Sequence, residues 1–278
     1  MTFDTKRKFG VEVEFISMHT QSSTVSKINA YLAEHNADFT VETAYYSDTS
    51  NTWRIKTDSS IQEGYDYGLE LVTPVLQGQA DYERLVLVLD AINSIDGVRV
   101  NRSTGLHIHV GVEDWKVSNF KNLVKRYAKF EKVLDSIMPE SRRMNNGSYC
   151  RSNFNSRYTL KDIYNEIDDK DTTRTLISSA SSGRYVKLNL QSFWKHGTVE
   201  FRHHSGTTNS TKISNWLRVV MAMVECADAR RSVKVATDDS VYDNDYTLTT
   251  FFNGLAKVSD LIDRRLRVFY NTRARRVA

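Results

Sequence analysis

The sequence predicts a mixed α and β fold, in which helices cover one side of an antiparallel or mixed sheet. Short segments with an apolar period of two alternate with longer segments whose period is near 3.6 residues, and no internal repeat or low-complexity tract interrupts them. Several of the short segments alternate cleanly between apolar and polar residues, which is typical of strands with one covered face.

The helical segments carry apolar stripes that can each cover a sheet. The members of the three stripes are Leu85, Leu89, Ile92 and Ile95; Phe120, Leu123, Tyr127, Phe130, Leu134 and Ile137; and Ile213, Trp216, Leu217, Val220, Val224 and Ala227. Aliphatic and aromatic stripes of this kind belong to the core, so we assign no cofactor to them.

Four predicted strands, at 9–15, 68–72, 106–110 and 198–202, carry titratable side chains. Successive side chains of a strand point to opposite faces, so the polar positions of each strand share one face. Those positions are Glu12 and Glu14, Glu70, His107 and His109, and Glu200 and Arg202. No lysine occurs among them, which distinguishes this face from the mixed polar face of an ordinary solvated strand.

If these strands are neighbours, their carboxylates crowd together and need a counter-charge. A close pair of like charges costs roughly 1 kcal/mol in water and about 4 kcal/mol at an effective dielectric near 20. A divalent cation such as Mg²⁺ or Mn²⁺ neutralises carboxylates directly and tolerates an imidazole ligand, which leaves Arg202 to meet an anion. The combination indicates a site for a nucleoside triphosphate, with Arg142, Arg143 and Arg184 as further candidate phosphate ligands.

Two stretches depart from the alternating pattern. Residues 141–184 are rich in Ser, Asn, Arg and Asp, contain one predicted short helix at 160–167, and are expected to form a surface excursion or lid. Later in the chain, a polar stretch precedes a last amphipathic segment at 248–270. We therefore expect a main domain at 1–230, which includes the lid-like excursion, and a helical C-terminal appendage at 231–278.

Composition argues against several classes of protein. The 278 residues carry a formal charge of only +4, unlike a dedicated binder of nucleic-acid backbones. The arginine-rich tail at 264–276 holds much of the excess and is more typical of a solvated helix end. Cys150 and Cys226 are too few for a disulfide framework or a four-thiolate zinc site. Neither a secretory signal nor an apolar run of about 18 residues is found, so we expect a soluble, cytoplasmic protein.

Six short motifs occur in order along the chain, from about Lys8 to Ala227. They are Gly10-Val-Glu-Val-Glu14-Phe, Asp58-Ser-Ser, Glu70-Leu-Val-Thr-Pro74, Gly105-Leu-His-Ile-His109-Val-Gly111, Ser141-Arg142 and Thr198-Val-Glu-Phe-Arg202-His. Each motif is weak alone, but the ordered set resembles the amidoligase family. That family belongs to the carboxylate–amine ligases related to glutamine synthetase and glutamate–cysteine ligase.

The resemblance implies an α+β fold like the catalytic domain of glutamine synthetase. In that fold a curved, mainly antiparallel sheet has helices on its convex face, and its concave face holds ATP, Mg²⁺ or Mn²⁺ and both substrates. The residues that match the metal ligands of the family are Glu12, Glu14, Glu70, His107 and Glu200.

The remaining matches imply catalytic and phosphate-binding roles. His109 and Arg202 match residues that reach the phosphate or the transferred phosphoryl group, and Arg142 and Arg184 match basic positions near phosphate. Asp58 matches an acidic turn, where it would hold the substrate ammonium and accept its proton. In this turn Ser59 replaces the usual glycine.

These matches predict an ATP-dependent ligase that forms an amide, of the peptide or isopeptide type, through an acyl phosphate at a multi-metal site. The expected substrates are a carboxylate and an amine carried by small molecules, peptides or modified macromolecules, with no membrane partner. The sequence identifies neither substrate and does not indicate an oligomeric state. Compact amidoligases of this size are similar to those of bacteria and phages, so a phage-encoded copy would act in the host cytoplasm.

Two alternative functions are compatible with parts of the sequence. A metal-dependent hydrolase is the first, because a His-x-His strand such as His107–His109 also serves zinc hydrolases. The second is a non-enzymatic nucleic-acid-binding protein that uses the arginine-rich tail.

Overall fold

The computed structural model of the protein describes most of the chain. The described residues are 3, 5–45, 47–62, 64–146, 148–154, 158–229 and 238–277. The chain forms two compact units, of which the first comprises residues 1–109 and 204–217 and the second comprises residues 110–203 and 218–278. It passes from one unit to the other within β5 (Gly105–Gly111), β7 (Thr198–Ser205) and α7 (Ser210–Asp228). Both units mix helices with strands, so the predicted α+β class is confirmed.

The first unit contains a mainly antiparallel sheet. Its strands lie in the order β2 (Val41–Thr43), β3 (Trp53–Thr57), β4 (Tyr67–Val72), β1 (Phe9–Ser17) and β5. β4 runs antiparallel to both β1 and β3, whereas the short β2 runs parallel to β3. In β1 the side chains of Val11, Val13 and Phe15 are almost fully buried, so the strand hides its apolar face as the alternation predicts.

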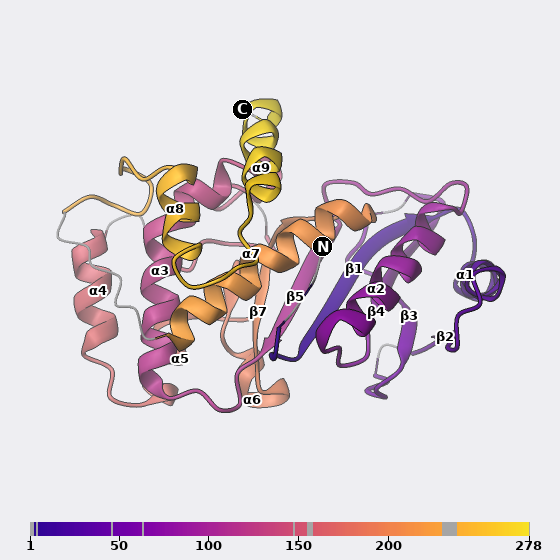
Figure 1. Ribbon diagram of the computed structural model, residues 1–278, viewed down its shortest axis with the longest axis horizontal. Coiled ribbons are helices and arrows are strands. Elements are labelled where there is room, and N and C mark those ends of the chain that lie inside the picture. The colour runs from indigo at the N-terminus through magenta and orange to yellow at the C-terminus, as the bar shows by residue number, and fades with distance from the viewer. Residues whose placement is uncertain are drawn as a thin grey trace. The chain divides into compact units, whose positions relative to one another are not determined.

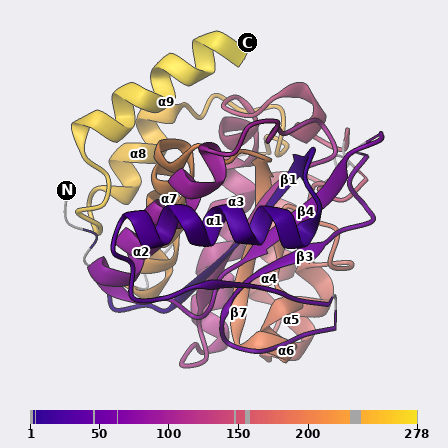
Figure 2. The same ribbon diagram turned by 90° about the vertical axis from the view of Figure 1, so that its right-hand side faces the viewer.

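Two helices, α1 (Gln21–Glu34) and α2 (Gly78–Asn93), cover this sheet. Figure 2 shows α1 lying across β1, β4 and β3, and α1 contacts β2, β3 and α2. At the start of α1 the Gln21 side chain donates hydrogen bonds to the carbonyl oxygens of Ala44 and Ile55, at 2.9 and 2.7 Å. These bonds connect the start of α1 to β3 and to the segment that follows β2.

The second unit is built around the long helix α3 (Val117–Asp135). Among the helices that contact it are α4 (Leu160–Asp168), α5 (Thr173–Ala180) and α8 (Leu248–Leu255), and α9 (Arg264–Val277) contacts α8 (Figure 1). The shorter elements are η1 (Glu140–Arg142), β6 (Leu188–Asn189) and α6 (Ser192–His196). β6 pairs antiparallel with β7. Phe120 and Leu134 of α3 are fully buried, so the apolar stripe of this helix faces the core.

Most of the predicted elements are confirmed. The four strands occur, and the three helical stripes fall in α2, α3 and α7. Ile95 and Ile137 are exceptions, because α2 and α3 end before them, although both side chains are buried. The last amphipathic segment contains α8 and the start of α9, and Asp263 caps α9 by accepting a hydrogen bond from the Leu266 backbone at 2.8 Å.

The polar stretch 141–184 contains more packed structure than its composition suggests. The predicted short helix is confirmed as α4, and α5 follows it without having been predicted. Leu176, Ile177 and Ala180 of α5 are buried, and the helix contacts α3. The role of this stretch as a lid stays a prediction, as do the proposed domain limits. Residues 231–237 of the proposed appendage lie outside the described part of the chain.

Within the described residues, no helix is both long enough and apolar enough to cross a membrane.

Candidate active site and metal centre

The polar face of the first unit gathers the carboxylates that the sequence predicted. Glu14 of β1 lies directly opposite Glu70 of β4 in the antiparallel register. The ring of His107, on β5, lies between two carboxylates of β1. Its Nδ1 is 3.2 Å from Oε2 of Glu12, and its Nε2 is 3.5 Å from Oε1 of Glu14. The alternation of three strands therefore brings these four side chains into one group.

Two more residues of β5, His109 and Gly105, contact the glutamates of this group. His109, two residues after His107, places its Nε2 3.6 Å from Oε1 of Glu12. At the start of the strand, the backbone N–H of Gly105 donates to Oε2 of Glu14 at 2.6 Å. Glu14 is 6% exposed, so this bond compensates for the loss of water around one of its oxygens.

The pKa values of Glu12 and Glu70, two carboxylates of this group, are shifted in opposite directions. Burial raises the pKa of Glu12, but the approach of the His107 and His109 rings outweighs burial and holds that pKa well below its usual range. Burial also raises the pKa of Glu70, and there the negative charges of Glu12, Glu14 and Asp58 raise the pKa further. The charge of Lys56 opposes this rise without reversing it, so negative charge predominates on the side of the group near Glu70.

Asp58 follows β3 and lies in a tight turn. Its Oδ1 accepts a hydrogen bond from the Ser60 backbone at 2.7 Å, and its own N–H donates to the carbonyl of Gly68 at 3.0 Å. The described non-glycine residues with positive φ do not include Ser59. Ser59 can therefore replace the glycine of the family motif without backbone strain.

The donor atoms of this group fit a hard divalent cation. One set of three comprises Glu12, Glu70 and His107, and a second comprises Glu14, Asp58 and Glu70. In each set, one ligand atom from every residue lies within 4.8 Å of the others. Carboxylate oxygens with no more than one imidazole are the donors that Mg²⁺ and Mn²⁺ accept. Both sets share Glu70, the carboxylate with the raised pKa.

Two of the predicted residues, Glu200 and Arg202, lie on β7 in the second unit. Nη1 of Arg202 donates to Oε1 of Glu200 at 2.6 Å, and Nδ2 of Asn189 donates to the other oxygen, Oε2, at 2.6 Å. Asn189 lies opposite Glu200 in the pairing of β6 with β7. Glu200 is 4% exposed, so its carboxylate is held by two donors in a mostly dry setting.

Three arginines remain from the predicted phosphate ligands. Arg143 donates through Nε to the carbonyl of Met138 at 2.9 Å. Arg142, in η1, is 6% exposed and lies near the Cys150 thiol, where burial raises the pKa of the thiol and the arginine opposes that rise. Arg184 is exposed, and its guanidinium lies 4.8 Å from the ring centre of Tyr185 and donates to the Tyr185 hydroxyl at 2.6 Å. Their roles stay predictions.

Residues 5–224 match the family model described as "Putative amidoligase enzyme". The chain belongs to this amidoligase family.

Three solved structures show a distant likeness to this member of the amidoligase family. The complex of the ligase PafA with the prokaryotic ubiquitin-like protein Pup has 12% identity and a TM-score of 0.46, and the alignment covers 98% of this chain and 63% of that one. A glutamine synthase homolog has 11% identity and a TM-score of 0.42, with 98% and 66% covered. Glutamine synthetase of Plasmodium falciparum has 9% identity and a TM-score of 0.40, with 98% and 72% covered.

The chain is thus shorter than these proteins and spans 63% of the length of the first. Among curated proteins, none matches its sequence.

A charged residue beside the candidate site, Lys56, was not predicted from the sequence. Lys56 of β3 lies opposite Glu70 and donates to the carbonyl of Asp48 at 2.6 Å. Burial and the nearby charge of Arg54 lower the pKa of Lys56, while Glu70 and Asp48 oppose that shift. Trp53 and Ile55 alternate with Arg54 and Lys56, and this alternation could have predicted the strand. The strand spans only five residues, so the pattern is short.

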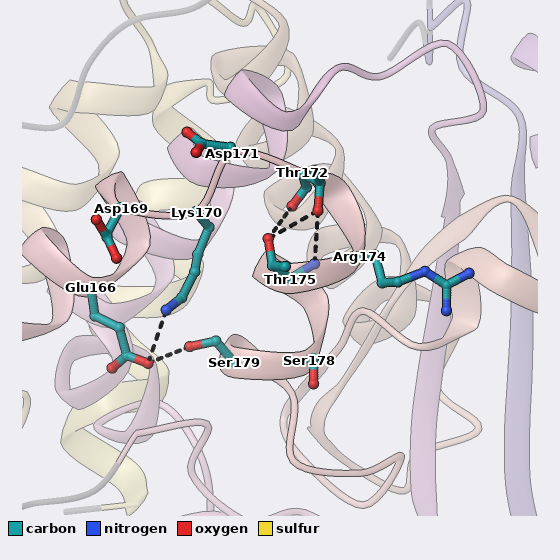
Figure 3. Close-up of a pocket in the computed structure, with 9 residues that line it drawn as sticks. All are labelled: Glu166, Asp169, Lys170, Asp171, Thr172, Arg174, Thr175, Ser178 and Ser179. Carbon is teal, nitrogen blue, oxygen red and sulfur yellow. Dashed lines mark hydrogen bonds and ion pairs between the residues drawn. The ribbon is translucent and has the colours of Figure 1, made fainter.

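A surface hollow of about 780 Å³ lies in the second unit, between α4 and α5. Figure 3 shows Lys170 and Ser179 both directed at the carboxylate of Glu166, whereas the guanidinium of Arg174 points away from them. None of the site residues predicted from the sequence lines this hollow. The candidate active site of this family member is therefore assigned to the strands and not to the hollow.

Proposed function

We propose that this chain is an ATP-dependent ligase that joins a carboxylate to an amine and uses Mg²⁺ or Mn²⁺. The observation that carries the proposal is the crowding of three glutamates around His107, with Glu70 shared between two sets of metal-type donors. Membership of the amidoligase family supports the same reaction class.

The chemistry requires activation of the acid. A carboxylate and an amine neutralise each other as a salt, and hydroxide is a poor leaving group, so direct condensation in water is slow. In the proposed reaction a carboxylate oxygen attacks the γ-phosphorus of ATP, and the bond to ADP breaks. The amine nitrogen then attacks the acyl carbon of the acyl phosphate, inorganic phosphate leaves, and the nitrogen loses a proton.

The proposed metal ligands are the five residues of the predicted set. They are Glu12, Glu14, Glu70, His107 and Glu200, and Asp58 belongs to one of the two donor groups as well. When bound, the metal would offset the negative charge of the phosphate oxygens.

The other residues act directly on the substrates in this proposal. Arg202 stabilises the negative charge that develops on the transferred phosphoryl group. Asp58 holds the ammonium group and accepts its proton, and His109 reaches the phosphate. Arg142 and Arg184 bind phosphate oxygens, and the stretch 141–184 excludes water from the acyl phosphate.

The wider assignments follow from the same proposal. Residues 1–230 would form the catalytic domain, and residues 231–278 would be an appendage. The acid and the amine would be carried by small molecules, peptides or macromolecules, and the reaction would take place in the cytoplasm of a bacterium or of a phage host.

The donor chemistry favours this ligase over a zinc hydrolase. Within the described part of the first unit, each candidate donor set contains at most one histidine and at least two carboxylates. Zinc sites usually rely on histidine and cysteine ligands, whereas carboxylate-rich sites suit Mg²⁺ and Mn²⁺. Tight stoichiometric zinc binding together with ATP-independent hydrolysis would favour the hydrolase instead.

The test is a search for the condensation product. Purified protein with Mg²⁺ or Mn²⁺ should release ADP only when both a carboxylate and an amine are present, across a broad panel of pairs. Cells that express the active chain should contain a product lighter by one water than its two halves, and Glu200→Ala should abolish it. The exposed Glu34→Ala is the matched control and should retain the product. Absence of ATP binding and of ADP release with every pair would overturn the proposal.

A further inference from the structure

A network of charged side chains lies buried in the second unit, next to the strand that carries Arg202. Nζ of Lys187 donates to Oε1 of Glu131 at 2.9 Å and to Oδ1 of Asp135 at 2.6 Å. Lys187 and Glu131 are fully buried, and Asp135 is 5% exposed. A lysine without contact with water is uncommon, and it stays charged only with such partners.

The network continues through an imidazole. Nε2 of His203 lies 2.6 Å from Oδ1 of Asp135, and its Nδ1 lies 2.8 Å from the hydroxyl of Tyr127. An ionised Asp135 can only accept, so the Nε2–H of His203 donates to it and Nδ1 accepts from Tyr127. His203 and Tyr127 are fully buried as well, so neither group can touch a substrate.

The charge states agree with this arrangement. Burial alone lowers the pKa of Lys187, but the negative charges of Glu131 and Asp135 outweigh it and raise that pKa. Burial raises the pKa of Asp135, and contacts with His203 and Lys187 more than reverse that effect. Burial and the charge of Lys187 lower the pKa of His203, so its ring is neutral at pH 7.

The same residues hold the backbone of Arg202. Its N–H donates to the carbonyl of Lys187 at 2.8 Å, and its carbonyl accepts a hydrogen bond from the Cys150 thiol at 3.3 Å. His203 is the next residue of β7. The network therefore holds His203, which follows Arg202 in the chain, and Lys187, which pairs with the backbone N–H of Arg202.

Stability alone does not account for these buried charges. Apolar side chains of similar volume often stabilise a core as well as a buried ion pair does, because removing charges from water is costly. No donor within the described residues reaches Oε2 of Glu131, which is buried, so the network leaves one strong acceptor unsatisfied. The directional hydrogen bonds of the network can fix the position of β7, which an apolar core would not do.

We propose that Lys187, Asp135 and His203 are positioning residues that fix the backbone of Arg202, and so the direction of its guanidinium. The catalytic consequence rests on the proposed function of Arg202, whereas the anchoring of β7 does not. The paired Glu200 depends on the same strand, since Arg202 donates to it at 2.6 Å.

The experiment combines amide hydrogen exchange with kinetics at a temperature where circular dichroism shows every variant to be folded. Lys187→Met keeps the length of the side chain and removes its charge. We expect exchange in residues 198–205 to be at least tenfold faster, and kcat to fall 10- to 100-fold while KM for ATP changes less than threefold. Arg218→Met is the matched control, because Arg218 is also a buried cation and pairs with Asp263 at 2.8 Å. It should change neither quantity.

His203→Gln provides a milder variant if Lys187→Met does not fold. The glutamine amide can donate to Asp135 from the position of Nε2, but its carbonyl oxygen does not occupy the position of Nδ1 that accepts from Tyr127, so we expect partial loss of kcat and intermediate exchange. Unchanged exchange in a folded variant overturns the proposal, whether or not the wild-type chain is a ligase. Faster exchange with unchanged kcat also overturns it and leaves the proposed function intact. A wild-type chain without ligase activity overturns the proposed function alone, and the exchange rates then decide the anchoring.

Discussion

Glu14 and Glu70 lie directly opposite each other on the paired strands β1 and β4, so two carboxylates occupy adjacent positions on one face of the sheet. Like charges in this position destabilise a sheet. The neighbouring Glu12 and Asp58 add further negative charge near Glu70. This arrangement is unfavourable for the protein alone and favourable for a cation between the carboxylates.

The first prediction is that Glu70→Gln stabilises the protein when no metal is present. The folded-state pKa of Glu70 is raised above its usual value, so ionisation of Glu70 costs stability, and the cost grows as the pH rises through that raised pKa. Removal of the charge should increase the free energy of unfolding by about 1 kcal/mol at pH 7.5, or Tm by roughly 2–4 °C in EDTA. Glu83→Gln, on the exposed side of α2, should leave Tm unchanged.

A lower Tm for Glu70→Gln than for wild type would contradict this interpretation. With Mn²⁺ the order should reverse, because Glu70 belongs to both donor sets and its loss should weaken binding at least tenfold. Titration calorimetry with Mn²⁺ measures this directly.

The second prediction concerns Glu12 and has the opposite sign. Its pKa is held below the usual value, so Glu12 contributes stability above that usual value, and the contribution is lost as the pH falls through the lowered pKa. Glu12→Gln should therefore lower the free energy of unfolding by about 1–3 kcal/mol at pH 7, because it removes the charged acceptor for His107. Thermal melts from pH 7 to pH 3 should show the difference from wild type shrinking with acid. A constant difference would indicate a packing effect instead.

The third prediction is that metal binding releases protons. A cation binds the ionised carboxylate, so it displaces the proton that the raised pKa of Glu70 retains. Affinity for Mn²⁺ should rise with pH until Glu70 is fully ionised and then level off. Calorimetry in buffers with different ionisation enthalpies gives the number of protons released. That number should fall in Glu70→Gln, and an equal release in both proteins would exclude Glu70 as the source.

Alternation alone was sufficient to predict the strands that carry the site. β1, β4, β5 and β7 each contain a row of buried apolar residues, and that row places the predicted site residues of each strand on the opposite face. Among the elements that were not found in this way are β3 and α5. β3 is only five residues long, and its cations Arg54 and Lys56 are buried. In α5, short polar residues hide a helix that depends on packing against α3.

The sequence also could not predict which residues of neighbouring strands lie opposite each other. Periodicity places Glu12 and Glu14 on one face, but the residue that opposes Glu14 depends on the non-local register of β1 with β4. The same holds for the buried network, because Lys187 and His203 meet Asp135 only after α3 has packed.

The last prediction tests the geometry of Arg202 apart from its charge. Arg202→Lys keeps a cation but loses the planar fork of donors, one of which binds Glu200 at 2.6 Å. If the guanidinium stabilises the transferred phosphoryl group, kcat should fall by roughly 100-fold with little change in KM for ATP, since the contact matters most in the transition state. Arg265→Lys, on the exposed face of α9, should retain wild-type kcat and controls for the general effect of exchanging arginine for lysine. A higher KM for ATP with unchanged kcat would instead assign Arg202 to ground-state binding of the nucleotide.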